Sequence, residues 1–545
     1  PKVTDAFKIK RKPAISLSKN VQKQSLSYSI KSVPVASTFL PASGTIKGID
    51  VGQKEVLFDN YLSVGFGNNI SPLFEVFMHH VTPFESEYGM NLKVNSVSDP
   101  VENTELSSSF YTIDLGLFLK QEDRYLDWSI GLNAQRRKNN WYGLPNTIDF
   151  NEFVINSIEP EQIYKTYEIF GDVEFEDSYI HDISAKISYF SDIFDSSEID
   201  ARVSSKLSFP LGRFGLNLED LDIHTGINYL SGSFSRGYAN TPKLKHGFIT
   251  ANIHPEYTFG FYDFTIKLGA KAYFTMDIER SVHQFLAYPD IDISYPIIPK
   301  YANIYVGASG DLQTNSFQSL SEANDFVSPT LNIFQTDQQY QAYGGLKGVL
   351  SGQLNYNVKG SFTSERTKPL FFSNLSRSNG ITTAEQGGFS FQPYEYGNSF
   401  DVVYDSVKTM SALGEIEYTY NKQMSFGFKG EFFSYSLSNE LEAWNLPTMK
   451  ADLFGKYKTE QWFAGVNIYF MGSRKGFLQT ENTTVDLDSF VDINLNGGYH
   501  FNDMLSFFVK ANNVTNSTYQ NFTNFNAQGL QVLGGVIWKF DSLFQ

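Results

Sequence analysis

The sequence contains no cysteine, and its apolar residues never form a long uninterrupted run. Without cysteine the chain has no disulfide framework, no thiolate metal site and no cysteine nucleophile. A membrane-spanning helix needs roughly 18 or more consecutive apolar residues, so a helical membrane protein is excluded. The chain also lacks a Gly-x-Ser-x-Gly element on a strand-to-helix turn, a phosphate-binding loop and a paired-histidine helix. We therefore expect neither an enzyme nor a cofactor.

Aromatic residues are abundant and charge is unevenly distributed. Aromatics make up 16% of the chain, with 49 phenylalanines and 32 tyrosines. The net charge is −16, yet residues 1–56 contain 10 Lys and Arg against 3 Asp and Glu. This basic tail could meet anionic lipid or an acidic partner, or serve as a solvated linker. Nucleic-acid binding is not expected.

Apolar and polar residues alternate from about position 61 to the C-terminus, in segments about ten to fifteen residues long. Successive side chains of a strand point to opposite faces, so the segments predict strands with one apolar and one polar face. In residues 490–496 the apolar positions are Val491, Ile493 and Leu495, and the polar positions are Asp492, Asn494 and Asn496. The segment 264–275 repeats the pattern, with Lys267 and Lys271 on its polar face.

The length and number of these segments predict an all-β fold, a transmembrane antiparallel β-barrel in the outer membrane of a Gram-negative cell. Strands of about ten or more residues suit a tilted crossing of the hydrocarbon layer, whereas soluble strands usually have about five or six. In lipid, only a closed sheet leaves no unpaired edge. We expect about 22 strands, within a range of about 18 to about 22.

Connections between the segments alternate in length, as expected for short periplasmic turns and long extracellular loops. The short ones lie near residues 81–85, 121–124, 176–179, 260–263, 295–300, 350–353, 421–423, 458–460 and 502–503. The long ones lie near residues 97–107, 137–160, 235–245, 314–337, 367–398, 438–446, 474–487 and 513–528. Two connections, near 68–71 and 191–197, should be long by this parity but are short. They leave the strand count open.

The C-terminal segment resembles the closing hairpin of TonB-dependent receptor barrels. The resemblance rests on Asn513-Val514-Thr515-Asn516, on Tyr519 and on the aromatic-ended segment 529–540, although residues 541–545 extend beyond its last aromatic. The segment 62–66 and its exit at residues 65–68 are similar to first strands of receptor-like barrels in one Gram-negative phylum. The resemblance covers residues 57–545 and implies a receptor-like outer-membrane barrel.

The same resemblance implies that a plug domain and a TonB-binding box would precede the barrel. Receptors of this family carry a large plug domain and a short box that binds TonB, whereas 56 residues precede the first expected strand. We expect a barrel without a complete plug and without a TonB box, unless a plug lay upstream of Pro1. Residues 1–56 alternate weakly and predict an extended periplasmic or lumenal segment.

Two sets of possible metal ligands lack the geometry of a metal site. His79 and His80 are adjacent on a strand, point to opposite faces and therefore do not share a metal. The pairs Asp486 and Asp488, and Asp290 and Asp292, lack the spacing of a calcium loop.

Three groups of candidate site residues remain. We expect the lumen to be lined by Asp492, Asn494, Asn496, Lys267 and Lys271. A lipid-interface girdle is expected at Trp128, Trp462, Trp538, Tyr469 and Phe470. The long loops are expected to carry exposed aromatic residues that either bind a partner or ligand or pack between loops. These residues are Trp141, Tyr142, Phe371 and Phe372.

The sequence is compatible with two functions. An open barrel of about 22 strands would leave a wide hole, and barrels of that size are normally plugged. The first hypothesis is therefore an accessory or structural subunit, whose partners are outer-membrane lipid and other outer-membrane or periplasmic proteins that help to fill it. The second hypothesis is a transport protein, passive or receptor-driven, with loops 314–337 and 367–398 folding inward. The sequence names no solute.

Overall fold

The computed structural model describes residues 58–82, 86–176, 178–214, 220–383, 385–387 and 391–541. The basic segment 1–56 lies outside these residues, so its expected extended path and its boundary with the barrel stay predictions. No helix within the described ranges is long and apolar enough to cross a membrane.

Strands account for nearly all of the regular structure. The barrel strands are β1 (Asn60–Gly67), β2 (Ser71–Val81), β3 (Ser86–Val97), β4 (Phe110–Glu122), β5 (Leu126–Asn140), β6 (Glu161–Phe175), β7 (Ile180–Ser191), β8 (Ser197–Pro210), β9 (Asp220–Ser233), β10 (Lys245–Phe261), β11 (Phe264–Asp277), β12 (Val282–Ile298), β13 (Ala302–Gln313), β14 (Thr336–Leu350), β15 (Leu354–Ser373), β16 (Phe400–Thr419), β17 (Met424–Leu437), β18 (Met449–Lys458), β19 (Trp462–Met471), β22 (Phe490–His500), β23 (Leu505–Asn512) and β26 (Gln531–Phe540). Two further hairpins are β20 (Arg474–Leu478) with β21 (Thr483–Leu487), and β24 (Gln520–Phe522) with β25 (Phe525–Asn526). The short helices are α1 (Glu152–Ile155), α2 (Phe317–Ala323), η1 (Leu211–Phe214) and η2 (Tyr238–Asn240).

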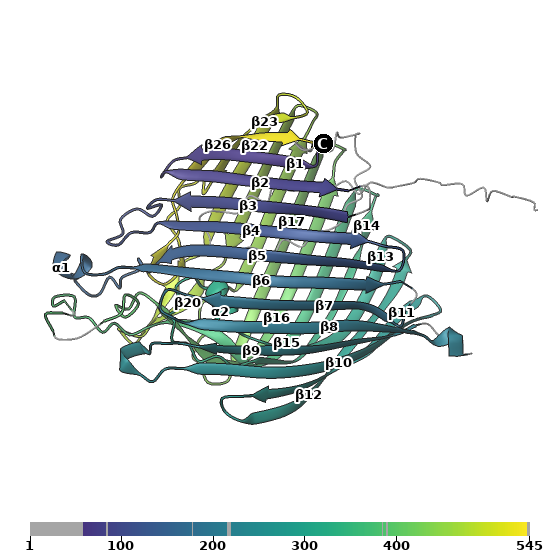
Figure 1. Ribbon diagram of the computed structural model, residues 1–545, viewed down its shortest axis with the longest axis horizontal. Coiled ribbons are helices and arrows are strands. Elements are labelled where there is room, and N and C mark those ends of the chain that lie inside the picture. Colours follow the sequence, from purple (N-terminus) through teal and green to yellow (C-terminus); the bar gives the residue numbers. More distant parts are fainter. Residues whose placement is uncertain are drawn as a thin grey trace, which may run out of the picture. The chain divides into compact units, whose positions relative to one another are not determined.

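The sheet closes on itself as an antiparallel barrel of 22 strands, as the sequence predicted. β1 pairs with both β2 and β26, so that Tyr61 lies opposite Phe77 on one side and Lys539 on the other. Closure pairs the backbone of every barrel strand on both edges, which a sheet in lipid requires. Figure 1 shows the strands side by side, with α1 at the end of the barrel that carries the long loops.

Side chains alternate between the two surfaces of the wall. On β22, Val491 and Leu495 are about two-fifths exposed on the outer, lipid-facing surface, whereas Asp492 and Asn494 are buried on the inner one. Aliphatic and aromatic side chains exposed on the outer surface recur around the barrel. In lipid this exposure is favourable, because the hydrocarbon interior replaces a protein core as the apolar solvent.

The structure accounts for the two connections that depart from the alternation of short turns and long loops. The 68–70 and 192–196 connections are short, yet they lie at the end of the barrel that carries the long loops. A short extracellular connection is therefore compatible with 22 strands. Two expected loops, near 137–160 and 367–398, are shorter than their patterns indicated, because β5 continues to Asn140 and β15 continues to Ser373.

Candidate functional site

The apolar core of the protein lies at the extracellular mouth of the barrel. It is built from loop residues and the outer ends of strands, and its buried members include Trp141, Tyr164, Phe190, Phe194, Leu230, Phe234, Phe248, Phe317, Leu320, Phe326, Val327, Leu331, Ile333, Tyr394, Phe400, Val402, Phe522 and Phe525. We call the described residues of the connections 141–160, 314–335, 374–399 and 513–530 the cap, because each connection contributes to this core. Burying so many aromatic rings stabilises the cap as a packed unit.

The connection 314–335, which we call the strap, crosses the mouth. It joins β13 to β14 but is bound to strands on other sides of the barrel, namely β5, β8 and β16. Val327 forms a parallel β-bridge with Phe400, and the Ser328 N–H donates to the Phe400 carbonyl at 2.8 Å. The strap therefore spans the lumen between distant parts of the wall.

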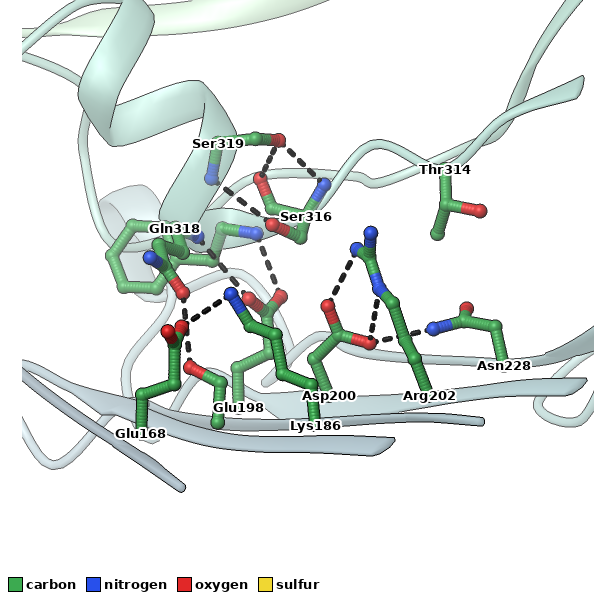
Figure 2. Close-up of polar contacts among 12 residues, drawn as sticks. Glu168, Lys186, Glu198, Asp200, Arg202, Asn228, Thr314, Ser316, Gln318 and Ser319 are labelled. Atoms are coloured by element: carbon green, nitrogen blue, oxygen red, sulfur yellow. Dashed lines mark hydrogen bonds and ion pairs between the residues drawn. The ribbon is translucent and has the colours of Figure 1, made fainter. Parts of the chain in front are cut away.

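Glu198 of β8 holds the first turn of α2 in the strap. Its carboxylate accepts hydrogen bonds from the backbone N–H groups of Phe317 at 2.7 Å and Gln318 at 3.2 Å. It also lies 2.7 Å from Nε2 of His246 on β10. Figure 2 shows Glu198 directed at α2, where Ser316 and Ser319 also form a capping box. A carboxylate at a helix N-terminus satisfies otherwise unpaired N–H groups and complements the helix dipole.

An ion pair fastens the far end of the strap to β5. Arg137 Nη1 lies 3.2 Å from Asp325 Oδ1, and Asn139 Nδ2 donates to the same oxygen at 2.9 Å. Arg137 also donates to the carbonyl of Ser321 at 3.1 Å. Burial raises the pKa of the Asp325 carboxyl, while the Arg137 guanidinium opposes that shift. Removing one partner from such a buried pair is costly, because the other charge is left without compensation.

Aromatic contacts lock the cap connections to one another. The Trp141 indole donates to the Phe326 carbonyl at 3.2 Å, and the Tyr142 hydroxyl donates to the Asn526 carbonyl at 2.8 Å. The rings of Phe326 and Phe525 stack with centroids 3.7 Å apart. Trp141 is 0% exposed. Trp141 and Tyr142 are therefore not exposed, and of the two roles expected for them the structure shows packing between loops.

Phe371 and Phe372 also differ from their prediction. They belong to the outer end of β15 rather than to a loop, and both are half-buried. Phe371 packs against the cap core and contacts the Phe522 ring at a centroid distance of 6.0 Å. The apolar run that was assigned to a loop is explained by packing of the strand end under the cap.

The expected lumen residues occupy two separate parts of the inner wall. Asp492 accepts a hydrogen bond from the Tyr519 hydroxyl at 3.0 Å, and Asn494 accepts one from the Asn513 N–H at 3.1 Å. Asn496 lies against Gly465 of β19. On β11, by contrast, Lys267 pairs with Asp290 at 2.7 Å, and Lys271 lies 3.5 Å from Asp311. The structure does not bring the two groups together.

The expected girdle is divided between the two surfaces. Trp462 and Trp538 are exposed on the outer surface, and Trp128 shares its face with the exposed Ile130 and Leu132. All three lie near the periplasmic ends of their strands.

Tyr469 does not belong to this girdle. It is 8% exposed and packs with Met471, Phe490, Tyr519 and Ala527 beneath the cap. Seven residues separate it from Trp462, and an odd separation on a regular strand places two side chains on opposite faces. Tyr469 therefore faces inward, whereas Phe470 lies on the same outer face as Trp462. The sequence contained this signal.

One cluster of possible metal ligands also lies on the inner wall. His254, Glu256 and Asp290 place ligand atoms within 4.8 Å of one another. The ammonium of Lys267 lies between the carboxylates, 2.7 Å from Asp290 and 3.4 Å from Glu256. Because Lys267 already supplies the positive charge there, we assign no metal to this cluster.

Sequence reasoning missed the contacts that anchor the strap. Glu198 occupies an ordinary inward position of a strand, and nothing near it in the sequence identifies α2 as its partner. The only local signal was Ser316, a residue type that is favoured at helix N-caps.

The fold defines the class of the protein: it is a β-barrel of the Gram-negative outer membrane, with 22 antiparallel strands. No family model matches the sequence, and no curated protein matches it.

Several solved structures share the fold. The ferripyoverdine receptor of Pseudomonas aeruginosa is 13% identical, with a TM-score of 0.64 over 90% of this chain and 72% of that one. The FrpB iron transporter of Neisseria meningitidis is 8% identical, with a TM-score of 0.63 over 89% and 83%. The ferric-catecholate import receptor Fiu of E. coli K12 is 10% identical, with a TM-score of 0.62 over 90% and 83%. Identity this low demonstrates a common fold alone.

Proposed function

We propose that this protein is an outer-membrane transport barrel in which the cap closes the extracellular mouth and moves to admit a solute. The observation that carries the proposal is the strap, which crosses the lumen and is anchored at Glu198 and through the Arg137–Asp325 ion pair. The strap is held by these polar contacts and by the apolar core of the cap. It can open without unfolding the wall, since loops open at lower free energy than paired strands.

The solved structures with this fold support transport, the second hypothesis from the sequence, over the accessory role of the first. They are named as an iron transporter, a ferric-catecholate import receptor and a ferripyoverdine receptor. In addition, the cap fills the mouth with the chain's own loops. A partner subunit is therefore not needed to close it. The accessory role takes second place, and no contact in the described part of the chain favours it. The proposal assigns no catalytic residue.

A reversible lock on the strap tests the proposal. The chain has no cysteine, so the double variant Val327→Cys, Phe400→Cys introduces a single thiol pair at a β-bridge. We expect the reduced variant to pass solute in proteoliposome swelling assays and the oxidised variant to pass at least about tenfold less, with recovery on reduction. Each single-cysteine variant serves as the control. If the oxidised and reduced double variants pass solute equally, the strap does not gate the barrel.

A further inference from the structure

A pocket of about 380 Å³ opens on the inner wall across β5 to β8, below the strap. Its lining includes Asn133, Glu168, Phe170, Asp172, Lys186 and Arg202. Their strands lie next to one another in the barrel, and all of these side chains share the lumenal face. Figure 2 shows part of this wall beneath α2, including Glu168, Lys186 and Arg202.

Strand register aligns an aromatic ring and two cations in one row. Gly131 lies opposite Phe170, Phe170 opposite Lys186, and Lys186 opposite Arg202. Neighbouring cross-strand side chains are separated by about 5 Å, which is the spacing of substituents that a single sugar ring or similar small ring can contact. The row is therefore a continuous surface at one height in the lumen.

Phe170 lies flat against the wall because its neighbour is glycine. A Cβ atom at Gly131 would meet Cζ of Phe170 at 2.2 Å and its two Cε atoms at 2.6 and 2.7 Å. The ring therefore covers Gly131 with one face, while it remains half-exposed where it lines the pocket. The negative face of an aromatic ring attracts the polarised C–H bonds of a ligand.

The charges of the pocket are balanced within the wall itself. Lys186 forms an ion pair with Glu168. Arg202 binds Asp200 through two hydrogen bonds, at 2.6 and 3.1 Å. The Lys186 and Arg202 side chains nevertheless remain 42% and 53% exposed.

Further polar groups in the pocket are neutral or acidic. Asp172 is exposed, and the hydroxyls of Ser184 and Ser204 lie 2.6 Å apart. Together with the paired cations they place donors and acceptors side by side around the ring of Phe170, without a net excess of positive charge.

We propose that this pocket binds one ring of a neutral polyhydroxylated solute, the chemical class of sugars. Each hydroxyl of such a solute both donates and accepts, so it matches a lining in which carboxylates, cations and hydroxyls alternate. The apolar C–H face of the ring packs on Phe170. An anionic chelate would instead require an uncompensated cation, and both cations here have carboxylate partners. The inference rests on the proposed transport function, for which it names the substrate class.

The test is isothermal titration of the full-length chain, purified in detergent, with neutral hexasaccharides and with citrate as an anionic probe. The panel consists of maltohexaose, cellohexaose and mannohexaose. We expect saturable binding of at least one hexasaccharide and none of citrate. Phe170→Ala should weaken the binding of that hexasaccharide roughly tenfold, the loss expected for one stacked ring.

The matched control is Phe454→Ala, since Phe454 also covers a glycine of the wall, Gly427, but does not line the pocket. It should change the binding constant less than about twofold. Binding of no hexasaccharide, preference for citrate, or equal losses in both variants would each overturn the inference. Solute passage through the barrel is measured separately, with the double variant Val327→Cys, Phe400→Cys. A barrel that transports solute but binds no sugar therefore refutes this inference and leaves the proposed transport function intact.

Discussion

Glu198 on β8 accepts a hydrogen bond from the N–H of Phe317, which lies 119 residues further along the chain. This contact joins the wall of the barrel to the loop that crosses its mouth. Glu198 is 2% exposed, so its carboxylate depends on the α2 N–H groups and on His246 for the interactions that water would otherwise provide. The contact therefore acts as a latch that holds the strap, and it also compensates the buried charge of the Glu198 carboxylate.

Glu198→Gln is expected to loosen the strap. An amide carries no charge and presents only one acceptor oxygen to the two N–H groups. Loss of charge-assisted hydrogen bonds costs roughly 1.5 to 3 kcal/mol, which increases the open fraction of the strap about ten- to a hundredfold. Chymotrypsin cleavage within residues 314–335 measures this opening. Glu322→Gln on the exposed side of α2 is the control, and equal cleavage rates in both variants would refute the latch.

Arg137→Met is expected to destabilise the cap more than a double variant that removes both charges. The single change leaves Asp325 buried without its cation, at a cost of roughly 3 to 5 kcal/mol. The double variant Arg137→Met, Asp325→Asn has no charge to desolvate and keeps an acceptor for Asn139. Amide hydrogen exchange within residues 314–335 reports the difference. Faster exchange in the double variant than in Arg137→Met would contradict this account.

The connection 192–196 is expected to become more stable in mild acid. Burial raises the pKa of Asp192 to about 6, against hydrogen bonds from Ser196, Gln162 and Phe194 that lower it. The native carboxyl therefore takes up a proton before the unfolded one, whose pKa is near 3.8. Native stability rises as the pH falls through 6, and the gain is complete once the pH is below the unfolded value.

Thermal unfolding at pH 5 and pH 7 measures the effect of Asp192. The Asp192→Asn variant should lose this part of the pH dependence, because its amide does not titrate and still accepts from the N–H groups of Phe194 and Ser196. If the wild type gains no more stability than the variant between pH 7 and pH 5, the prediction for Asp192 is refuted.

Gly131→Ala is expected to displace the ring of Phe170. The added Cβ would lie 2.2 Å from Cζ, so the ring must move, at a cost of roughly 1 to 3 kcal/mol for overpacking. Gly360→Ala on β15 is the control, because a Cβ there meets nothing within 4 Å. Thermal midpoints of the two variants provide the comparison. Equal midpoints would mean that Phe170 is not seated on Gly131 as described.

The alternation of side chains explains why much of the fold could be predicted. Val491, Asp492 and Leu495 reveal their faces through their own positions, because a strand has a period of two residues. Where that rule was applied, the strands and their number were correct. Where it was neglected, as for Tyr469, an inward residue was assigned to the lipid surface.

Sequence alone determined that the chain forms a closed, lipid-facing barrel, since alternation and strand length are local properties that only one membrane architecture satisfies. The tertiary structure decided how the mouth is closed. Trp141 meets Phe326, and Arg137 meets Asp325, across 185 and 188 residues of chain respectively. Such contacts depend on where closure of the sheet places each loop. No periodicity in the sequence encodes these positions, because loops have no repeating geometry that links one residue to the next.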